Sequence, residues 1–351
     1  MKHSSSSSPR VVSIVLVGLL LLAGIGGCSK DPTPPSVPRT PSKVHEWTDC
    51  LKDVQIVCGN MLGFVDQQHF DDVYDCLEQA NDAWQDDFNT QWGYLDDEDF
   101  DDMADQLGFV DEQALMNFEG SFGAQYMSWR TRLANAEDAW LLNGADPATN
   151  PYLQDPCADE VMATLLNQNT NVMIGGVIIH YAANGDIVTI SNGDCSLVPC
   201  ILTDPPCPDP VIRVKSHLGV NHCGSEYGSD YGEASYYNQA PRRVVWFLKY
   251  QSVGGFTNGY QFRSEIRHYR WKNNQWKKKR TNLGVTQNGY LYVPDNNCDQ
   301  HEINDPQSPR KCKSRHNSYV PTVYGDPAIL DESIRSTFQY TGNVTVDHLD
   351  I

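Results

Sequence analysis

The chain has 351 residues, 45 acidic and 26 basic side chains, a formal net charge of −19 and eleven cysteines. This length is enough for two ordinary domains, even after a leader peptide is removed. No two cysteines form a C-x₂-C pair, which argues against a zinc site and favours disulfides.

The first 28 residues have the three parts of an export signal. Lys2 and Arg10 flank a serine run, an apolar core covers residues 11–25, and Gly26-Gly27-Cys28 follows. The apolar core is too short to be a comfortable permanent membrane helix, so this pattern predicts a secretory signal peptide over residues 1–27. The exit Ile25-Gly26-Gly27-Cys28 resembles the lipobox of bacterial lipoproteins. That resemblance implies cleavage before Cys28 and acylation of this cysteine; the alternatives are an ordinary signal peptide or an N-terminal anchor helix.

Residues 28–45 are predicted to be a spacer behind the lipidated cysteine. Five prolines between positions 32 and 41 favour an extended, semi-rigid segment that holds a folded body away from a membrane. Ser29 stands directly after Cys28, and by resemblance to Gram-negative lipoproteins this favours the outer membrane. Whether the protein faces the periplasm or the cell surface stays open. No family is recognised for the folded body.

The cysteine count agrees with lipidation of Cys28, because ten cysteines then remain for five disulfides. Spacing suggests local groups without fixing the connectivity. The first group is Cys50, Cys58, Cys76 and Cys157; the second is Cys195, Cys200, Cys207 and Cys223; the third is Cys298 and Cys312.

Charge is distributed unevenly along the chain. Residues 29–160 hold 28 acidic and 6 basic side chains, a net charge of −22, whereas residues 161–351 hold 17 and 18, a net charge of +1. Within the latter part, residues 211–315 hold 8 acidic and 17 basic side chains, a net charge of +9. The acidic part is expected to form solvated helical faces.

Residues 46–195 are predicted to be a helical region that ends in a β-hairpin. Asp66 and Asp111 are expected to cap two amphipathic helices, the second of which continues to Asn143. Residues 62–68 and 107–113 share five consecutive letters and a sixth, so we expect a duplicated unit. The acidic run at residues 95–102 lacks the glycine and glutamate of an EF-hand and is expected to be a solvated helix face.

Residues 196–351 are predicted to be a disulfide-bearing, antiparallel, sandwich-like β region, which makes the fold class α+β. A hairpin over residues 177–190 with an Asn184-Gly185 turn precedes it, and His180 within that hairpin is interpreted as structural. Further strands are expected at residues 211–216, 243–251, 260–271, 275–282, 290–293 and 336–346.

The hairpin around Asn273-Asn274 is the best candidate for a binding surface, because basic and aromatic residues together can hold acidic or sugar ligands. Two alternatives stay open: a charged strand edge that prevents aggregation, or attraction to the acidic half of the same chain. The candidate ligand-binding residues are Arg267, Arg270, Trp271, Trp276, Lys277, Lys278, Lys279 and Arg280.

Few other stretches suggest chemistry. A metal site at His217 and His222-Cys223 is disfavoured, since Cys223 is expected to be oxidised, and the glycine-rich residues 224–232 are expected to form a surface loop. No nucleotide-binding or serine-hydrolase motif occurs, so neither a cofactor nor a metal is predicted.

The sequence therefore predicts a lipid-anchored protein of the cell envelope that acts as a non-enzymatic binding module. Its expected partners are the membrane, through the lipid, and an acidic polysaccharide or another envelope protein; export argues against nucleic acid. An envelope hydrolase with a site assembled by the fold and a purely structural envelope component are the alternatives.

Overall fold

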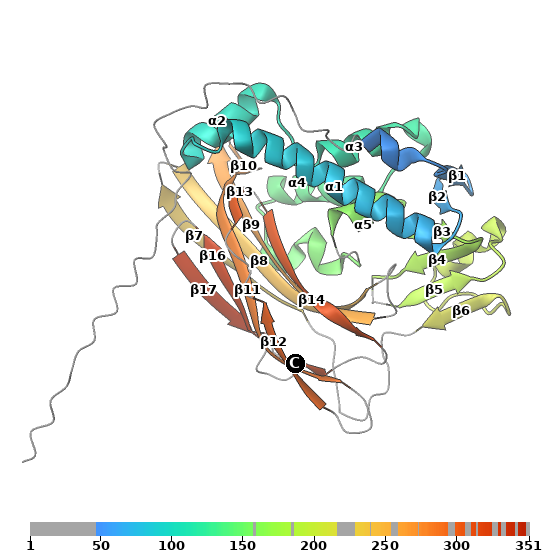
Figure 1. Ribbon diagram of the computed structural model, residues 1–351. Helices are drawn as coiled ribbons and strands as arrows, with labels where there is room; N and C mark the ends of the chain where they lie inside the picture. Colours follow the sequence, from blue (N-terminus) through green and yellow to red (C-terminus); the bar gives the residue numbers. More distant parts are fainter. Residues whose placement is uncertain are drawn as a thin grey trace, which may run out of the picture.

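The computed structural model shows a mixed α+β fold in which the helices precede most of the sheet (Figure 1). It describes residues 47–156, 159–183, 186–215, 229–238, 240–253, 259–272, 274–293, 299–305, 310–313, 315–324, 329–330, 335–340 and 343–348. The export signal, Cys28 and the spacer lie outside these residues. Within the described part of the chain, none of the helices combines the length and apolar character needed to cross a bilayer.

The acidic half contains four main helices and several short ones. The first, α1, begins after Asp66, whose carboxylate accepts a hydrogen bond from the His69 amide at 2.9 Å. Its buried residues recur at helical spacing on one face, as the periodicity predicts. The helices are α1 (Gln67–Trp92), α2 (Asp97–Leu107), α3 (Gln113–Gly120), α4 (Trp129–Leu142), α5 (Glu160–Leu165) and α6 (Val198–Ile201), with short 3₁₀ turns η1 (Trp47–Leu51), η2 (Gly123–Gln125), η3 (Pro147–Thr149), η4 (Pro151–Gln154) and η5 (Cys195–Leu197).

Two expectations for the helices are wrong. The single helix expected after Asp111 is two helices, because Gly123 adopts a positive φ of 63° and Ser128 caps a new helix through the Thr131 amide. The expected duplication is not structural either. Residues 62–64 lie in a strand, whereas Leu107 ends α2 and Gly108 caps it with φ 65°. The two similar segments therefore have different local structures.

A first sheet of six strands accompanies the helices, in the order β1-β2-β3-β4-β5-β6. Strands β2 and β3 are parallel, and the other neighbours are antiparallel. The expected hairpin is confirmed as β4 and β5, although its turn lies outside the described residues. Because β6 pairs with β5, this sheet extends past the boundary expected at residues 195–196. The strands are β1 (Gln55–Val57), β2 (Met61–Phe64), β3 (Asn171–Ile174), β4 (Val177–Tyr181), β5 (Ile187–Ile190) and β6 (Ile212–Lys215).

The later part of the chain forms two antiparallel sheets that pack together, as the sandwich-like prediction requires. Trp246 stacks on Phe338 at 5.7 Å between ring centroids, and Gln287 donates to the Ser264 hydroxyl at 2.8 Å. One sheet contains β7 (Ser229–Asn238), β8 (Ala240–Val253), β9 (Gly259–Lys272), β10 (Gln275–Lys278) and β14 (Arg315–Tyr324). The other contains β11 (Thr281–Val293), β12 (Asp299–Asp305), β13 (Arg310–Lys313), β15 (Ile329–Leu330), β16 (Arg335–Tyr340) and β17 (Asn343–His348).

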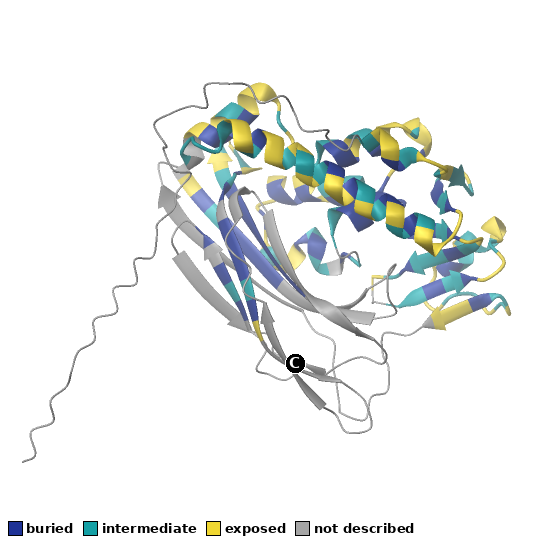
Figure 2. Ribbon diagram, in the orientation of Figure 1, coloured by how far each residue is buried: buried dark blue, intermediate teal, exposed yellow. Residues whose placement is uncertain are grey.

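A large apolar core lies between the helices and the first sheet, where Leu62, Phe70 and Phe118 are fully buried. Figure 2 colours the buried residues dark blue. A second contact joins the helices to the later sheets. There Trp140 of α4 packs edge-on against Tyr269 of β9 at 5.8 Å between ring centroids. The helical half is therefore attached directly to the β-rich half.

Three disulfides connect described cysteines: Cys50–Cys76, Cys58–Cys195 and Cys200–Cys207. The second crosses two of the groups expected from spacing. It does so because residues 195–201 pack beside the β1–β2 turn, in a core shared with Met61 and Ile190. The remaining expected disulfide cysteines, Cys157, Cys223, Cys298 and Cys312, lie outside the described side chains.

Candidate functional site

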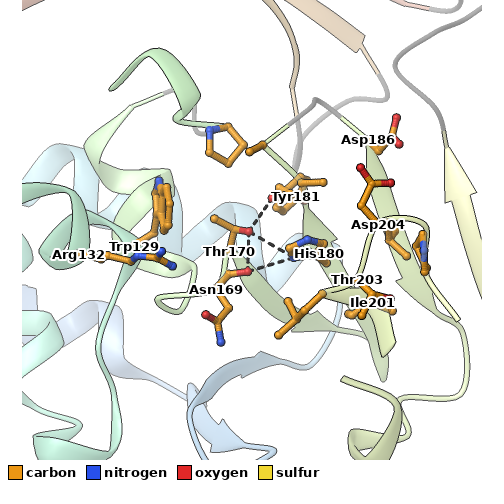
Figure 3. A pocket seen from close by; sticks show the side chains of 16 residues that line it. Trp129, Arg132, Asn169, Thr170, His180, Tyr181, Asp186, Ile201, Thr203 and Asp204 are labelled. Atoms are coloured by element: carbon orange, nitrogen blue, oxygen red, sulfur yellow. Dashed lines mark hydrogen bonds between the residues drawn. The ribbon is translucent and has the colours of Figure 1, made fainter. Parts of the chain in front are cut away.

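A groove beside His180 carries polar and aromatic side chains together. Its volume is about 510 Å³. Trp129 and Arg132 of α4 form one wall, the residues following α6 form the other, and His180 of β4 lies between them (Figure 3). We call this cavity the His180 groove. Its lining comprises Trp129, Arg132, Pro156, Asn169, Thr170, His180, Tyr181, Ala182, Ala183, Asp186, Val188, Ile201, Leu202, Thr203, Asp204 and Pro206.

The floor of the groove is a tightly bonded turn that leads into β3. The Asn167 side chain accepts hydrogen bonds from the amides of Asn169 and Asn171, each at 3.0 Å. Thr170 is held at φ 60°, an uncommon conformation for a β-branched residue, which costs about 1–3 kcal/mol. The Thr170 amide donates to Asn167 and its carbonyl accepts from the Tyr181 amide, so backbone bonds on both sides hold this conformation.

The same turn fixes the protonation state of His180. Its Nδ1 lies 2.8 Å from Asn171 Oδ1 and 3.0 Å from the Asn169 carbonyl oxygen. Both oxygens only accept hydrogen bonds, so Nδ1 carries the proton. Burial lowers the pKa of His180, although the Asn169 carbonyl opposes this. The imidazole is therefore neutral near pH 7, with the lone pair on Nε2, for which the described residues offer no hydrogen-bond partner.

The α4 wall is rigid. Trp129 donates its indole N–H to Asp155 at 2.8 Å, and the Arg132 guanidinium lies over the Trp129 ring at 4.9 Å. Arg132 Nη1 also donates to the Gln168 carbonyl at 2.7 Å. The opposite wall is the loop closed by the Cys200–Cys207 disulfide, in which Thr203 donates to the Cys200 carbonyl at 2.9 Å.

The candidate residues of the basic hairpin lie elsewhere, on β9, β10 and the start of β11. The predicted hairpin is confirmed: Trp271 pairs with Trp276 across it, with 5.3 Å between their ring centroids. Trp271 is 40% exposed, and Lys277 is exposed and forms no ion pair with a described residue. Lys278 is exposed as well, with 42% of its side chain accessible, but it is ion-paired, so Trp271 and Lys277 are the exposed candidates without an ion pair to a described residue.

The other basic candidates are paired with carboxylates of the acidic helical half, as one of the three alternatives predicts. Lys278 Nζ lies 2.7 Å from Glu137, and Lys279 Nζ lies 3.2 Å from Asp101. Arg267 binds Glu137 at 2.8 Å, Arg270 lies 3.6 Å from Asp101 and from Asp102, and Arg280 lies 3.3 Å from Asp111. A ligand anion at these cations would have to compete with internal carboxylates.

The acidic run is correspondingly not a purely solvated face. Asp101, Asp102 and Asp105 bring carboxylate oxygens within 4.8 Å of one another, but Asp101 is buried. Basic side chains of the hairpin lie against this group: Arg270, Lys272, Lys279 and Arg280. The other sequence candidates, His217, His222 and residues 224–228, lie outside the described residues, and Ser229–Asn238 is strand β7 rather than loop.

Sequence reasoning missed Trp129, Arg132 and Asp204 as members of one cavity and assigned His180 a structural role. The Nδ1 contacts agree with that role, but the ring also lines the groove. The only local signal was the proline- and cysteine-rich segment 192–210, which indicates a stapled loop or a domain junction without fixing which cysteines pair. Comparison of the chain with protein-family models, with curated proteins and with solved structures finds no match.

Proposed function

We propose that this protein is a lipid-anchored, non-enzymatic binding module of the cell envelope, and that its ligand site is the His180 groove. Acylated Cys28 would tether it, by the lipobox resemblance, to the outer membrane. The observation that supports the ligand site is the groove itself. Its volume of about 510 Å³ falls within the range of small-molecule sites, and it combines an indole, a guanidinium and a neutral imidazole.

The groove is a better candidate than the hairpin because of what each side chain already binds. Five of the eight hairpin candidates form ion pairs with the helical half. In the groove, Arg132 keeps guanidinium N–H groups beyond the one that Gln168 accepts, and His180 keeps Nε2. Binding is favoured over hydrolysis, because no described hydroxyl or thiol is hydrogen-bonded to Nε2 as an activated nucleophile would be.

Blocking the groove tests the ligand site. Ala183 is exposed and lines the groove, so Ala183→Trp should place a bulky aromatic ring in it. The matched control is Ala139→Trp on the exposed face of α4. Envelope extract fractions and defined saccharides and peptides would be screened by thermal shift on the mature protein. Stabilisation by a small molecule that Ala183→Trp removes and Ala139→Trp retains is the expected result; equal responses in both variants would contradict the assignment.

The tether is tested separately. Cys28→Ala should move the protein from the membrane fraction to the soluble fraction, because the acyl chains provide the membrane affinity. Mass spectrometry of the mature wild-type N-terminus should show an acylated cysteine. Membrane retention of Cys28→Ala at the wild-type level would disprove the lipoprotein assignment.

A further inference from the structure

The two walls of the His180 groove carry charges of opposite sign. Arg132 lies on the α4 wall, and Asp204 lies on the disulfide-closed wall, with His180 between them (Figure 3). Asp186 also lines the side opposite Arg132. The groove therefore has a direction, from a cationic wall to an anionic wall.

The cationic wall is suited to bind a carboxylate. Arg132 is exposed, but its guanidinium is positioned by the Trp129 ring below it and by the Gln168 carbonyl beside it. Trp129 is itself fixed through Asp155. A guanidinium held in this way loses little freedom on binding, and its planar fork matches the two oxygens of a carboxylate.

The anionic wall is suited to bind a cation. Asp204 is exposed and forms no ion pair with any described residue, and it lies within the short loop that the Cys200–Cys207 disulfide closes. The loop is braced by the Cys207 amide, which donates to the Cys200 carbonyl at 3.2 Å. Between the walls, Nε2 of the neutral His180 can accept a hydrogen bond and suits an N–H group of the ligand.

Resting on the proposed function, we infer that the groove binds a short peptide with free termini, a small zwitterion, with its carboxylate at Arg132 and its ammonium group at Asp204. An anion would be attracted by Arg132 but repelled by Asp204 and Asp186. A cation would be attracted by Asp204 and Asp186 but repelled by Arg132. A ligand with both charges gains at both walls, and the peptide N–H groups between its termini can donate to His180.

Calorimetric titration of the mature protein tests whether the carboxylate of the ligand binds at Arg132 and its ammonium group at Asp204. The probes are glycine, diglycine, triglycine and tetraglycine, together with the N-acetylated and the C-amidated form of each peptide. At least one free peptide should bind, and each blocking group should weaken its binding about fivefold to tenfold at low salt, because one charge-assisted contact is lost.

Two variants identify which wall binds which end. Asp204→Asn should weaken the binding of the free peptide. N-acetylation should then have no further effect on affinity, whereas C-amidation should still lower it. Arg132→Gln should do the opposite. The matched controls are Asp138→Asn on the exposed face of α4 and Lys277→Gln on the hairpin, which should bind as wild type.

Failure of this inference can be distinguished from failure of the proposed function. If no free peptide binds, or if blocked and free peptides bind within about twofold of each other, the zwitterion inference is wrong. Binding of an uncharged disaccharide that Ala183→Trp abolishes would still support the groove as the ligand site. Absence of any ligand effect that depends on Ala183 overturns both.

Discussion

Glu137 of α4 and Arg267 of β9 form a fully buried salt bridge, with 2.8 Å between Oε1 and Nη1, at the contact between the helices and the later sheets. Tyr269 donates to the same carboxylate at 2.9 Å, and Tyr152 donates to it at 3.1 Å. Lys278 reaches the second oxygen from the solvent side, with 42% of its side chain exposed. One carboxylate therefore pairs with cations from two strands, and Arg267 has a second carboxylate partner in Glu265.

Removing the charge of Glu137 should destabilise the protein strongly. Glu137→Gln keeps the shape of the side chain but leaves Arg267 buried with less compensation, and such changes cost about 3–5 kcal/mol. Chemical denaturation should measure this loss in the free energy of unfolding. The control is Asp138→Asn on the exposed side of the same helix, which should change it by less than about 0.5 kcal/mol. Similar effects of both substitutions would contradict the assigned role.

Because of the same carboxylate, the free energy of unfolding should depend on pH in the acidic range. Burial acts to raise the pKa of Glu137, but Arg267 and Lys278 outweigh it and lower the pKa to about 2, below its ordinary 4.5. The unfolded chain therefore binds this proton first as pH falls. The contribution of Glu137, about 3 kcal/mol, is present above pH 4.5 and is lost as pH falls towards 2. The difference in unfolding free energy between wild type and Glu137→Gln should shrink over that interval.

Lys277 and Lys279, two positions apart in the sequence, should respond very differently to the same substitution. Lys279 is buried and its ammonium lies 3.2 Å from Asp101, so Lys279→Glu places two carboxylates together and should cost more than about 3 kcal/mol. Lys277 is exposed, so Lys277→Glu should cost less than about 0.5 kcal/mol. Thermal unfolding of the two variants is the measurement. A loss of stability that is equal at both positions would show that Lys279 is not buried against Asp101.

These lysines show what local sequence patterns can predict about the structure and what they cannot. The Asn273-Asn274 turn between aromatic and β-branched residues predicted the β9–β10 hairpin, because a short turn sets the register of the two strands that it joins. This pattern could not distinguish Lys277 from Lys279, because Lys279 is buried against Asp101 of α2, which is far away in the sequence. The opposite charges of the two halves gave a general expectation of attraction, but not the partners.

The groove was harder to predict for a related reason. Its walls come from α4 and from the segment after α6, and they meet only because β3, β4 and β5 are neighbours in one sheet. Thr170 adopts a positive φ although its residue type gives no indication of it. Helix α4 was itself expected to be the second half of a longer helix, so the start of α4 at Trp129 was hidden.

The loop that forms the anionic wall should depend on its disulfide. Replacing Cys200 and Cys207 together with serine removes a closure over a sequence separation of 7 residues, and the loop-entropy relation gives a loss of about 2–3 kcal/mol. The groove should also lose ligand affinity, since Asp204 is no longer held. Non-reducing peptide mapping should first show the three pairs Cys50–Cys76, Cys58–Cys195 and Cys200–Cys207. If Cys200 and Cys207 were recovered in two different disulfides, the loop that carries Asp204 would not be closed as described here.

His180 should titrate below its ordinary pKa of 6.5 and carry its proton on Nδ1 when neutral. As pH falls below 6.5, the unfolded chain takes up the proton before the folded protein does. The free energy of unfolding should therefore decrease between pH 6.5 and the lowered pKa of the folded state, and this contribution should be absent in His180→Gln. Nitrogen chemical shifts of the imidazole measure both the pKa and the tautomer.

Asn171 provides the contrasting variant for His180. Asn171→Asp places a carboxylate where Oδ1 now lies, 2.8 Å from Nδ1, and should raise the pKa of His180 because an adjacent negative charge favours the imidazolium. Protonated His180 cannot accept a hydrogen bond at Nε2, so the variant should also bind peptide less well near neutral pH than wild type does. Asn192→Asp, at an exposed turn beyond β5, controls for added charge. A neutral His180 with its proton on Nε2 would show that the turn does not orient the ring and that the groove offers the ligand a donor at this position instead.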